Sequence, residues 1–355
     1  MDIISVSRKG GYSMAFKVGV GRSNFAALRR AGNYYVDKTE LMYELVEETD
    51  NEVTLFTRPR RFGKTLMVSM MENFFDIRKD SRKLFEGLQI TRHRTFCENW
   101  LNQYPVLFIS LKDIEAETFQ DAYAMLKVRL ADVCKEYDDL KNNMRVNPFD
   151  AEIFVRLEAQ TCNLADVKNA LKTIMRMMYA VYGKEVILLI DEYDVPLAKA
   201  SEKDTAVNQF YSSMLDVMRG MMGTALKDNE YLKFAVITGC LRIAKESFFT
   251  GTNNFAPYSV LDEDFSQYFG FSEREVSELL SAANCEEKAD VIKEWYDGYR
   301  FGMSDVYCPW DVINQCDKLR VWADAPMEPH WENSSSNAII QDLIENATEA
   351  TKAEI

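Results

Sequence analysis

The stretch from Val53 to Thr65, VTLFTRPRRFGKT, constrains the fold of this chain more than any other. Residues 53–57 are mostly apolar or β-branched and predict a short buried strand, which the arginines and proline of residues 58–61 end in a loop. The triplet at residues 63–65, Gly-Lys-Thr, opens a segment with apolar residues at spacings of three and four, which predicts a helix with one buried face. That face is formed by Leu66, Met67, Met70, Met71, Phe74 and Phe75.

A loop between a buried strand and a helix can hold a phosphate group. Its backbone N–H groups and the helix N-terminus would face the anion, Lys64 would reach the β and γ oxygens, and the Thr65 hydroxyl would bind Mg²⁺. We therefore expect this loop, the phosphate loop of residues 58–63, to bind a nucleotide. The candidate nucleotide-binding residues are Arg58, Pro59, Arg60, Arg61, Phe62, Gly63, Lys64, Thr65 and Leu66.

The motif is incomplete at its first position. Phosphate-binding loops follow the pattern GxxxxGK[ST], and this chain has Arg58 in place of the first glycine. Pro59, whose φ is fixed, offers an alternative turn. Because the triplet GKT also occurs by chance, the loop alone leaves a second interpretation open, a helix start with a solvated lysine.

A second stretch, EVILLIDE at residues 185–192, supplies what the loop lacks. Its five consecutive aliphatic residues predict a central parallel strand that is buried on both faces. Acidic residues at the carboxyl end of such a strand lie where open α/β sheets bind ligands. Asp191 would hold the Mg²⁺, and Glu192 would orient or deprotonate the attacking water. Taken alone, the stretch is also compatible with a strand followed by a solvated acidic turn.

Residues 233–238, KFAVIT, predict the next buried strand. A polar group at the end of this strand can touch the γ-phosphate or the attacking water, so Thr238 is a candidate catalytic residue. Arg242, four residues further on, is a candidate for neutralising charge in the transition state. Either residue could equally serve only in the turn.

Composition narrows the class of protein. With 355 residues, 47% of them hydrophobic, the chain can build one large core and a smaller module. No run approaches the roughly 20 apolar residues of a membrane-spanning helix, and the N-terminus lacks the order of a secretory signal. Seven cysteines without a CxxC pair are typical of reduced thiols, so we expect a cytoplasmic protein without a membrane partner. Two histidines disfavour a zinc site or a histidine-based triad.

A net charge of -14 makes the surface as a whole repel polyanions. The densest basic cluster is the loop itself, with three arginines and Lys64, and a nucleoside triphosphate explains it more economically than a nucleic acid does. Nucleic acid therefore stays an open but disfavoured partner for this chain.

The pattern along the chain predicts three parts. Residues 1–50 form a leader packed on the core, residues 51–258 the core itself, and residues 259–355 a small lid that ends without a cap and is expected to be truncated. Within the core, residues 113–181 have helical periodicity and no phosphate or metal motif, which predicts a helical insertion.

Three local features refine these parts. Ser272 and Glu275 form a capping box, which predicts a helix start in the lid. The segment 295–302, WYDGYRFG, is interpreted as an aromatic turn between helices. Tyr34 and Tyr35 precede the phosphate loop and are more typical of core than of a platform for an adenine ring.

Five segments together carry a family resemblance: YYVDKT, TRPRRFGKT, LLIDEYDVPL, ITGCLRIAKESFFTGTNNF and WYDGYRFG. In this order they resemble the predicted AAA-ATPase-like family of bacteria, a P-loop group usually followed by a PD-(D/E)XK nuclease-like domain. The resemblance runs from about Phe16 to the C-terminus. It implies an α/β fold with an AAA-like, three-layer P-loop core, a mainly parallel sheet and a helical or winged-helix lid. It also implies that Arg58 is a family trait and that the nuclease-like module begins after this chain ends.

The sequence thus favours one function and leaves two others open. The favoured one is a Mg²⁺-dependent ATPase whose cycle moves a partner or a C-terminal module. The alternatives are a nucleotide-binding switch without significant turnover and a DNA-associated defence or regulatory component. No pattern identifies the base, the protein partner or the oligomeric state, and fold alone does not supply them.

Overall fold

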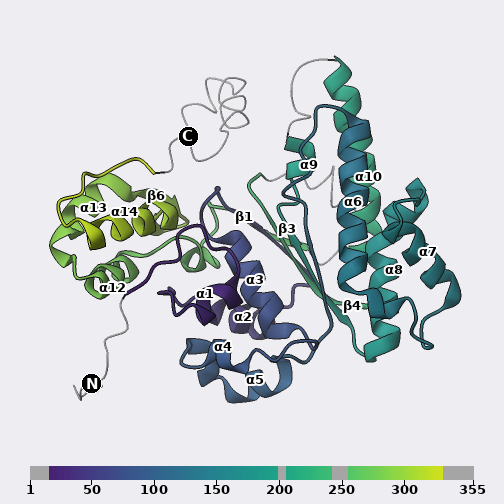
Figure 1. Ribbon diagram of the computed structural model, residues 1–355, viewed down its shortest axis with the longest axis horizontal. Helices are drawn as coiled ribbons and strands as arrows, with labels where there is room; N and C mark the ends of the chain where they lie inside the picture. The colour runs from purple at the N-terminus through teal and green to yellow at the C-terminus, as the bar shows by residue number, and fades with distance from the viewer. Residues whose placement is uncertain (1–15, 199–204, 242–254, 331–355) are drawn as a thin grey trace.

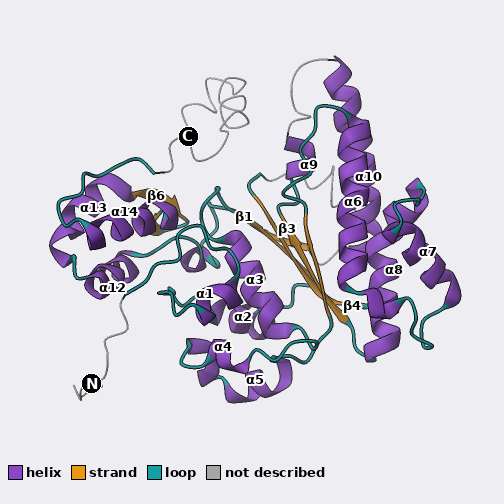
Figure 2. Ribbon diagram, in the orientation of Figure 1, coloured by secondary structure: helices purple, strands orange, loops and turns teal. Residues whose placement is uncertain are grey.

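The computed structural model describes residues 16–198, 205–241 and 255–330, and it has an α/β fold. A five-stranded sheet lies between two layers of helices, and a smaller C-terminal unit, residues 259–330, lies to one side of them (Figure 1). The colouring by secondary structure separates the central strands from the helices on both faces (Figure 2). Among the described helices, none is both long enough and apolar enough to cross a membrane. The predicted α/β class with a parallel sheet is therefore confirmed.

The sheet has the strand order β2-β3-β4-β1-β5, and every neighbouring pair is parallel. The carboxyl ends of the strands meet at one edge, because Thr57 at the end of β1 pairs with Gly239 of β4 and Ser110 of β2 pairs with Asp191 of β3. Strand β4 thus separates the strand before the phosphate loop from the strand that ends in Asp191. The strands are β1 (Val53–Thr57), β2 (Val106–Ser110), β3 (Val186–Asp191), β4 (Leu232–Gly239) and β5 (Phe255–Tyr258).

Both faces of the sheet are buried, which explains the unbroken apolar run of β3. Side chains alternate between the two faces of a strand. Val186, Leu188 and Ile190 pack into one hydrophobic cluster, and Ile187 and Leu189 pack into the other. Two helical layers supply the rest of each cluster, as a parallel sheet requires.

The first layer surrounds the helix that follows the phosphate loop, α3 (Lys64–Phe75). Its apolar face is buried as the spacing of three and four predicts. The neighbouring helices are α1 (Phe25–Arg30), α2 (Glu40–Tyr43), the π-helix η1 (Glu44–Glu48), α4 (Arg82–Phe85), the 3₁₀ helix η2 (Gln89–Arg92) and α5 (Arg94–Trp100).

The second layer contains the segment predicted as a helical insertion. Its helices share one hydrophobic cluster with α10 and with the opposite face of the sheet, and they form the crossover from β2 to β3. Figure 1 shows α6, α8 and α10 side by side along the sheet. The helices are α6 (Phe119–Glu136), η3 (Asp138–Leu140), α7 (Pro148–Glu158), α8 (Leu164–Tyr182), α9 (Val195–Ala198) and α10 (Thr205–Leu226).

The C-terminal unit has its own hydrophobic cluster. The predicted capping box is confirmed, because the Ser272 hydroxyl accepts a hydrogen bond from the Glu275 N–H and the Glu275 carboxylate accepts one from the Ser272 N–H. The last part of the predicted lid, residues 331–355, lies outside the described residues. The elements are η5 (Ser266–Tyr268), α12 (Glu273–Ala283), η6 (Glu286–Lys288), α13 (Ala289–Tyr296), β6 (Asp297–Phe301), β7 (Ser304–Tyr307) and α14 (Pro309–Val321).

The interpretation of residues 295–302 as an aromatic turn between helices is wrong. Residues 297–301 form strand β6, which pairs in the antiparallel direction with β7. The alternation of Tyr299 and Phe301 with Gly298 and Arg300 fits a strand, and the two-residue connection at Gly302, with φ of 55°, closes the hairpin.

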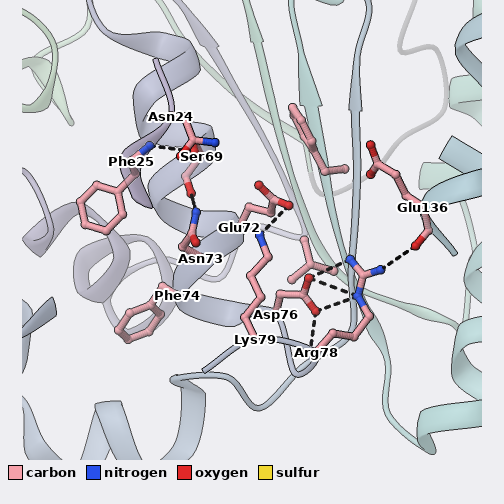
Figure 3. A network of polar contacts seen from close by, with 12 residues as sticks. Asn24, Phe25, Ser69, Glu72, Asn73, Phe74, Asp76, Arg78, Lys79 and Glu136 are labelled. Atoms are coloured by element: carbon pink, nitrogen blue, oxygen red, sulfur yellow. Dashed lines mark hydrogen bonds and ion pairs between the residues drawn. The ribbon is translucent and has the colours of Figure 1, made fainter. Parts of the chain in front are cut away.

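The far end of α3 is fixed by a polar network (Figure 3). The fully buried Asp76 ends the helix and accepts hydrogen bonds from the Arg78 guanidinium at 2.8 to 3.2 Å. Arg78 in turn donates to the backbone carbonyl of Glu136 in α6. Nearer the start of α3, Ser69 accepts a hydrogen bond from the Phe25 N–H of α1. Helix α3 is therefore fixed to α1 in its own layer and, through Asp76 and Arg78, to α6 in the layer on the opposite face of the sheet.

Replacing Asp76 by alanine tests this anchoring. The change removes the carboxylate that accepts hydrogen bonds from the N–H and the guanidinium of Arg78, so we expect the free energy of unfolding to fall by about 2 kcal/mol. Chemical unfolding with urea at pH 7 measures it. Asp80→Ala is the matched control, since Asp80 is exposed and should change stability by less than about 0.5 kcal/mol. Equal stabilities of the two variants would contradict the anchoring role.

Candidate functional site

The predicted site residues from three different segments meet at the carboxyl edge of the sheet. Asp191, at the end of β3, is fully buried. One of its carboxylate oxygens accepts a hydrogen bond from the Thr65 hydroxyl at 2.9 Å, and the other accepts one from the Thr238 hydroxyl at 2.5 Å. The carboxylate thus joins the first turn of α3 to the end of β4.

The phosphate loop turns sharply before α3. Arg61 and Gly63 both adopt left-handed backbone conformations, with φ of 72° and 83°. Glycine adopts this conformation without the steric cost that a β-carbon brings, which explains Gly63 at the helix N-cap. No side chain caps this N-terminus, so the N–H groups of the first turn of α3 have no side-chain partner. Such an N-terminus is suited to an anion.

The Lys64 side chain is buried within the loop. Its ammonium group donates hydrogen bonds to the carbonyl oxygens of Arg58 and Pro59, both at 2.8 Å, and lies 3.4 Å from the Cys240 sulfur. The positive charge is thereby held between the phosphate loop and the residue that follows β4.

Glu192 follows Asp191 directly and has a left-handed backbone with φ of 55°. Its N–H donates to the Thr238 hydroxyl at 3.4 Å. Burial raises the pKa of Glu192, the negative charge of Asp191 raises it further, and Lys64 and Arg60 oppose the increase. A carboxylate that binds its proton more tightly than usual is suited to accept a proton from water.

Asp194 is a member of the site that sequence reasoning missed. Its carboxylate is buried and accepts hydrogen bonds from the N–H groups of Cys240 and Leu241 at 2.9 and 2.8 Å. Its other oxygen has no hydrogen-bond partner in the described part of the chain, and burial raises the pKa of Asp194. Asp194 therefore ties the turn after β3 to the turn after β4, directly before Arg242, which lies outside the described residues. A third acid in the sequence DEYD was the available signal.

Several predicted nucleotide-binding side chains lie against the C-terminal unit. The Arg58 guanidinium lies over the Phe269 ring at 4.7 Å, and the Arg61 guanidinium lies over the Trp310 ring at 4.1 Å. The ring of Phe62 contacts those of Tyr299 and Phe301, with centroids 4.9 and 5.0 Å apart. Of the loop arginines, Arg60 is half-buried and near enough to Glu192 to lower its pKa.

An apolar cavity of about 110 Å³ lies beside the start of α3. Its walls come from the phosphate loop, from the segment before α2 and from two helices of the C-terminal unit. Tyr34 and Tyr35, which the sequence favoured as core residues, both line it, and the Tyr35 hydroxyl donates to the Met70 sulfur at 3.1 Å. The other residues that matter here are Gly63, Leu66, Leu279 and Ile313.

The oxygen donors at the edge of the sheet fit a magnesium ion better than a transition metal. The part of the chain that the structure describes contains no group of three or more histidine, cysteine or acidic residues that could hold a metal. Thr65 and Asp191 instead offer two hard oxygen ligands within 2.9 Å of each other. Mg²⁺ takes few protein oxygens and completes its shell with waters and substrate phosphates.

The raised pKa of Glu192 yields a test without any ligand. Folding raises the pKa of Glu192 above the ordinary value of about 4.3, so the folded state binds this proton more tightly than the unfolded state does. As the pH rises through this range the proton is lost, and the stability that it contributes is lost with it. The ionised carboxylate therefore lowers stability at pH 7. We expect Glu192→Gln to raise the free energy of unfolding at pH 7 and to lose this advantage as the pH falls to about 4.

Urea unfolding of both proteins between pH 4 and pH 8 measures the effect. The matched control is Glu98→Gln, because Glu98 is exposed on α5. A Glu192→Gln variant no more stable than the parent at pH 7 would contradict a raised pKa of Glu192, as would a gain in stability that does not change with pH.

Comparisons with known proteins found a relative and a family. The chain is 26% identical over 329 residues to an uncharacterized protein in the vnfD 5' region of Azotobacter chroococcum mcd 1, covering 92% of this chain and 56% of that relative. The chain thus spans little more than half the length of the relative. A family model described as Predicted AAA-ATPase matches residues 19–249, which include the phosphate loop, Asp191 and Thr238. The chain therefore belongs to the AAA-ATPase-like family.

Proposed function

We propose that this protein binds ATP together with Mg²⁺ and hydrolyses the bond between its β- and γ-phosphates. One observation carries the proposal: the Asp191 carboxylate holds the Thr65 hydroxyl at the start of α3 and the Thr238 hydroxyl at the end of β4. A threonine directly after a buried loop lysine, bonded to an acid at the end of a central strand, provides metal and phosphate ligands side by side.

Phosphate binding falls to the loop and to Lys64. The N-terminus of α3 has no side-chain cap and would receive the phosphate oxygens, with its dipole favouring the negative charge. Lys64, already held at the loop by two carbonyl oxygens, is positioned to exchange one of these contacts for a phosphate oxygen. Arg60, near Glu192, adds positive charge at the same edge.

Thr65 and Asp191 would hold the magnesium ion. When bound, Mg²⁺ supplies charge neutralisation at the β and γ oxygens. The Thr238 hydroxyl keeps Asp191 oriented, because it donates to the carboxylate oxygen that Thr65 does not use.

Glu192 is the proposed general base. Its backbone N–H donates a hydrogen bond to the Thr238 hydroxyl, which places the backbone of Glu192 beside the proposed metal ligands. Its raised pKa favours taking a proton from the attacking water. Thr238 is also proposed to touch that water or the γ-phosphate, and Arg242, which lies outside the described residues, to neutralise transition-state charge.

The apolar cavity is the proposed site of the base. It adjoins Gly63 and Leu66, so a nucleotide with its phosphates at the loop could place its base between Tyr34, Tyr35 and helix α14. The C-terminal unit then acts as a lid of helices with a hairpin as a wing. We propose that the nucleotide cycle, in the cytoplasm, moves a protein partner or a C-terminal module beyond this unit.

Two substitutions separate nucleotide binding from turnover. Lys64→Ala removes a charged hydrogen bond worth about 1.5 to 3 kcal/mol, so ATP affinity should fall at least tenfold. Glu192→Gln should keep the affinity and lose on the order of 100-fold or more in turnover. Calorimetric titration and phosphate release measure the two effects.

Lys83→Ala is the control, since Lys83 is exposed on α4 and should change neither quantity. Parent-like hydrolysis by both site variants would show that the assignment is wrong. Single-turnover measurement with the parent distinguishes an ATPase from a switch, because a switch would hold ATP without releasing phosphate.

Ile313→Trp tests the base site. The larger side chain on α14 would occupy the cavity, so the affinity for ATP should fall about tenfold or more. Inorganic triphosphate has no base, and its affinity should stay unchanged, which makes it the internal control. Equal losses for the two ligands would place the base elsewhere.

A further inference from the structure

Arg58 occupies the position of the first glycine of a phosphate loop, and its side chain is fully buried. One terminal nitrogen, Nη1, donates to the carbonyl oxygens of Thr57 and Tyr258 at 3.0 and 2.9 Å. The other two guanidinium nitrogens, Nε and Nη2, have no hydrogen-bond partner among the residues that the structure describes. Burial of a cation with two unbonded nitrogens is costly: it lowers the pKa of Arg58 although the negative charge of Asp262 opposes the shift, so further contacts must stabilise the cation.

Two aromatic rings of the C-terminal unit take the place of those hydrogen bonds. The guanidinium carbon lies 4.7 Å from the centre of the Phe269 ring and 5.4 Å from that of the Phe301 ring. A cation over an aromatic face is attracted by the electrons of the ring, more strongly in a buried site than in an exposed one. Arg58 and both rings are buried, so this contact is of the stronger kind. The contact between Arg61 and Trp310 is of the weaker kind, because Arg61 is exposed.

The backbone of the same residue is bonded to the opposite side of the site. The Arg58 N–H donates to the Gly239 carbonyl at the end of β4. Its own carbonyl oxygen accepts one of the two loop hydrogen bonds of the Lys64 ammonium group. One residue therefore contacts the C-terminal unit through its side chain and Lys64 through its backbone.

From this arrangement we infer that Arg58 is a positioning residue: its guanidinium ties the phosphate loop to the C-terminal unit, so that the placement of Lys64 depends on the packing of Phe269 and Phe301. The inference rests on the proposed function only in that Lys64 is taken to bind phosphate. A glycine at this position could not make the connection. Nucleotide at the loop and displacement of the C-terminal unit would then influence each other reciprocally.

The first arm of the test needs no nucleotide. Phe301→Leu keeps an apolar side chain and removes the ring, and Arg58→Met keeps the chain length and removes the cation. We expect both to increase hydrogen exchange, measured by mass spectrometry, in the peptide that contains the N–H groups of Arg58 and Met67, which donate to Gly239 and Gly63. The control is Ile292→Ala, a buried change in the same unit on α13, which does not line the cavity; it should raise exchange in α13 only.

The second arm measures nucleotide binding by calorimetry. Phe301 does not line the cavity proposed for the base, yet Phe301→Leu should weaken ATP binding about tenfold, as Arg58→Met should. Ile292→Ala should bind like the parent. Arg58→Lys, which keeps a cation near the rings, should recover at least half of the loss caused by Arg58→Met, whereas a purely structural role would not depend on the charge.

The outcomes separate this inference from the proposed function. If the parent binds ATP, but Phe301→Leu and Arg58→Met leave both binding and exchange at the loop unchanged, the inference is overturned. A lysine variant no better than the methionine variant would overturn it as well. If the parent binds no ATP, the proposed function fails, while the exchange arm still decides whether Arg58 connects the loop to the C-terminal unit.

Discussion

The buried carboxylate of Asp191 is the interaction on which the rest of the site depends. A buried negative charge must find donors, and its two oxygens find the hydroxyls of Thr65 and Thr238. Because these donors come from α3 and β4, the two hydrogen bonds of one carboxylate fix the positions of α3, β3 and β4 relative to one another at the edge of the sheet. The lysine beside Thr65 and the acid beside Asp191 are placed as a consequence.

The sheet makes this meeting possible. Parallel strands end at the same edge, and the strand order puts β4 between β1 and β3, so Thr238 stands between the phosphate loop and the acidic pair. Anchoring of α3 at its far end keeps the helix from turning away from this edge (Figure 3). The C-terminal unit then packs on the outside of the loop, where arginine and aromatic side chains meet.

The parts of the structure that were predictable are those in which a local pattern decides the outcome. The aliphatic run before Asp191 predicted a strand buried on both faces, and the triplet at residues 63–65 predicted a helix start; the structure contains both. The turn of Arg58 toward Phe269 and the tie made by Asp194 depend on residues far away in sequence, so no local pattern showed them. The hairpin of β6 and β7 was missed because an aromatic segment also suits a turn.

Fold and family thus agree on an ATPase-like core whose loop is unusual at its first position. We propose that Lys64, Thr65 and Asp191 form one site for a triphosphate and its metal. Calorimetric titration of the parent protein with ATP, in the presence and in the absence of Mg²⁺, tests it most directly. We expect ATP to bind at one site per chain and to bind more tightly when Mg²⁺ is present. No binding heat under either condition, or binding indifferent to both Mg²⁺ and the Asp191→Ala change, would contradict it.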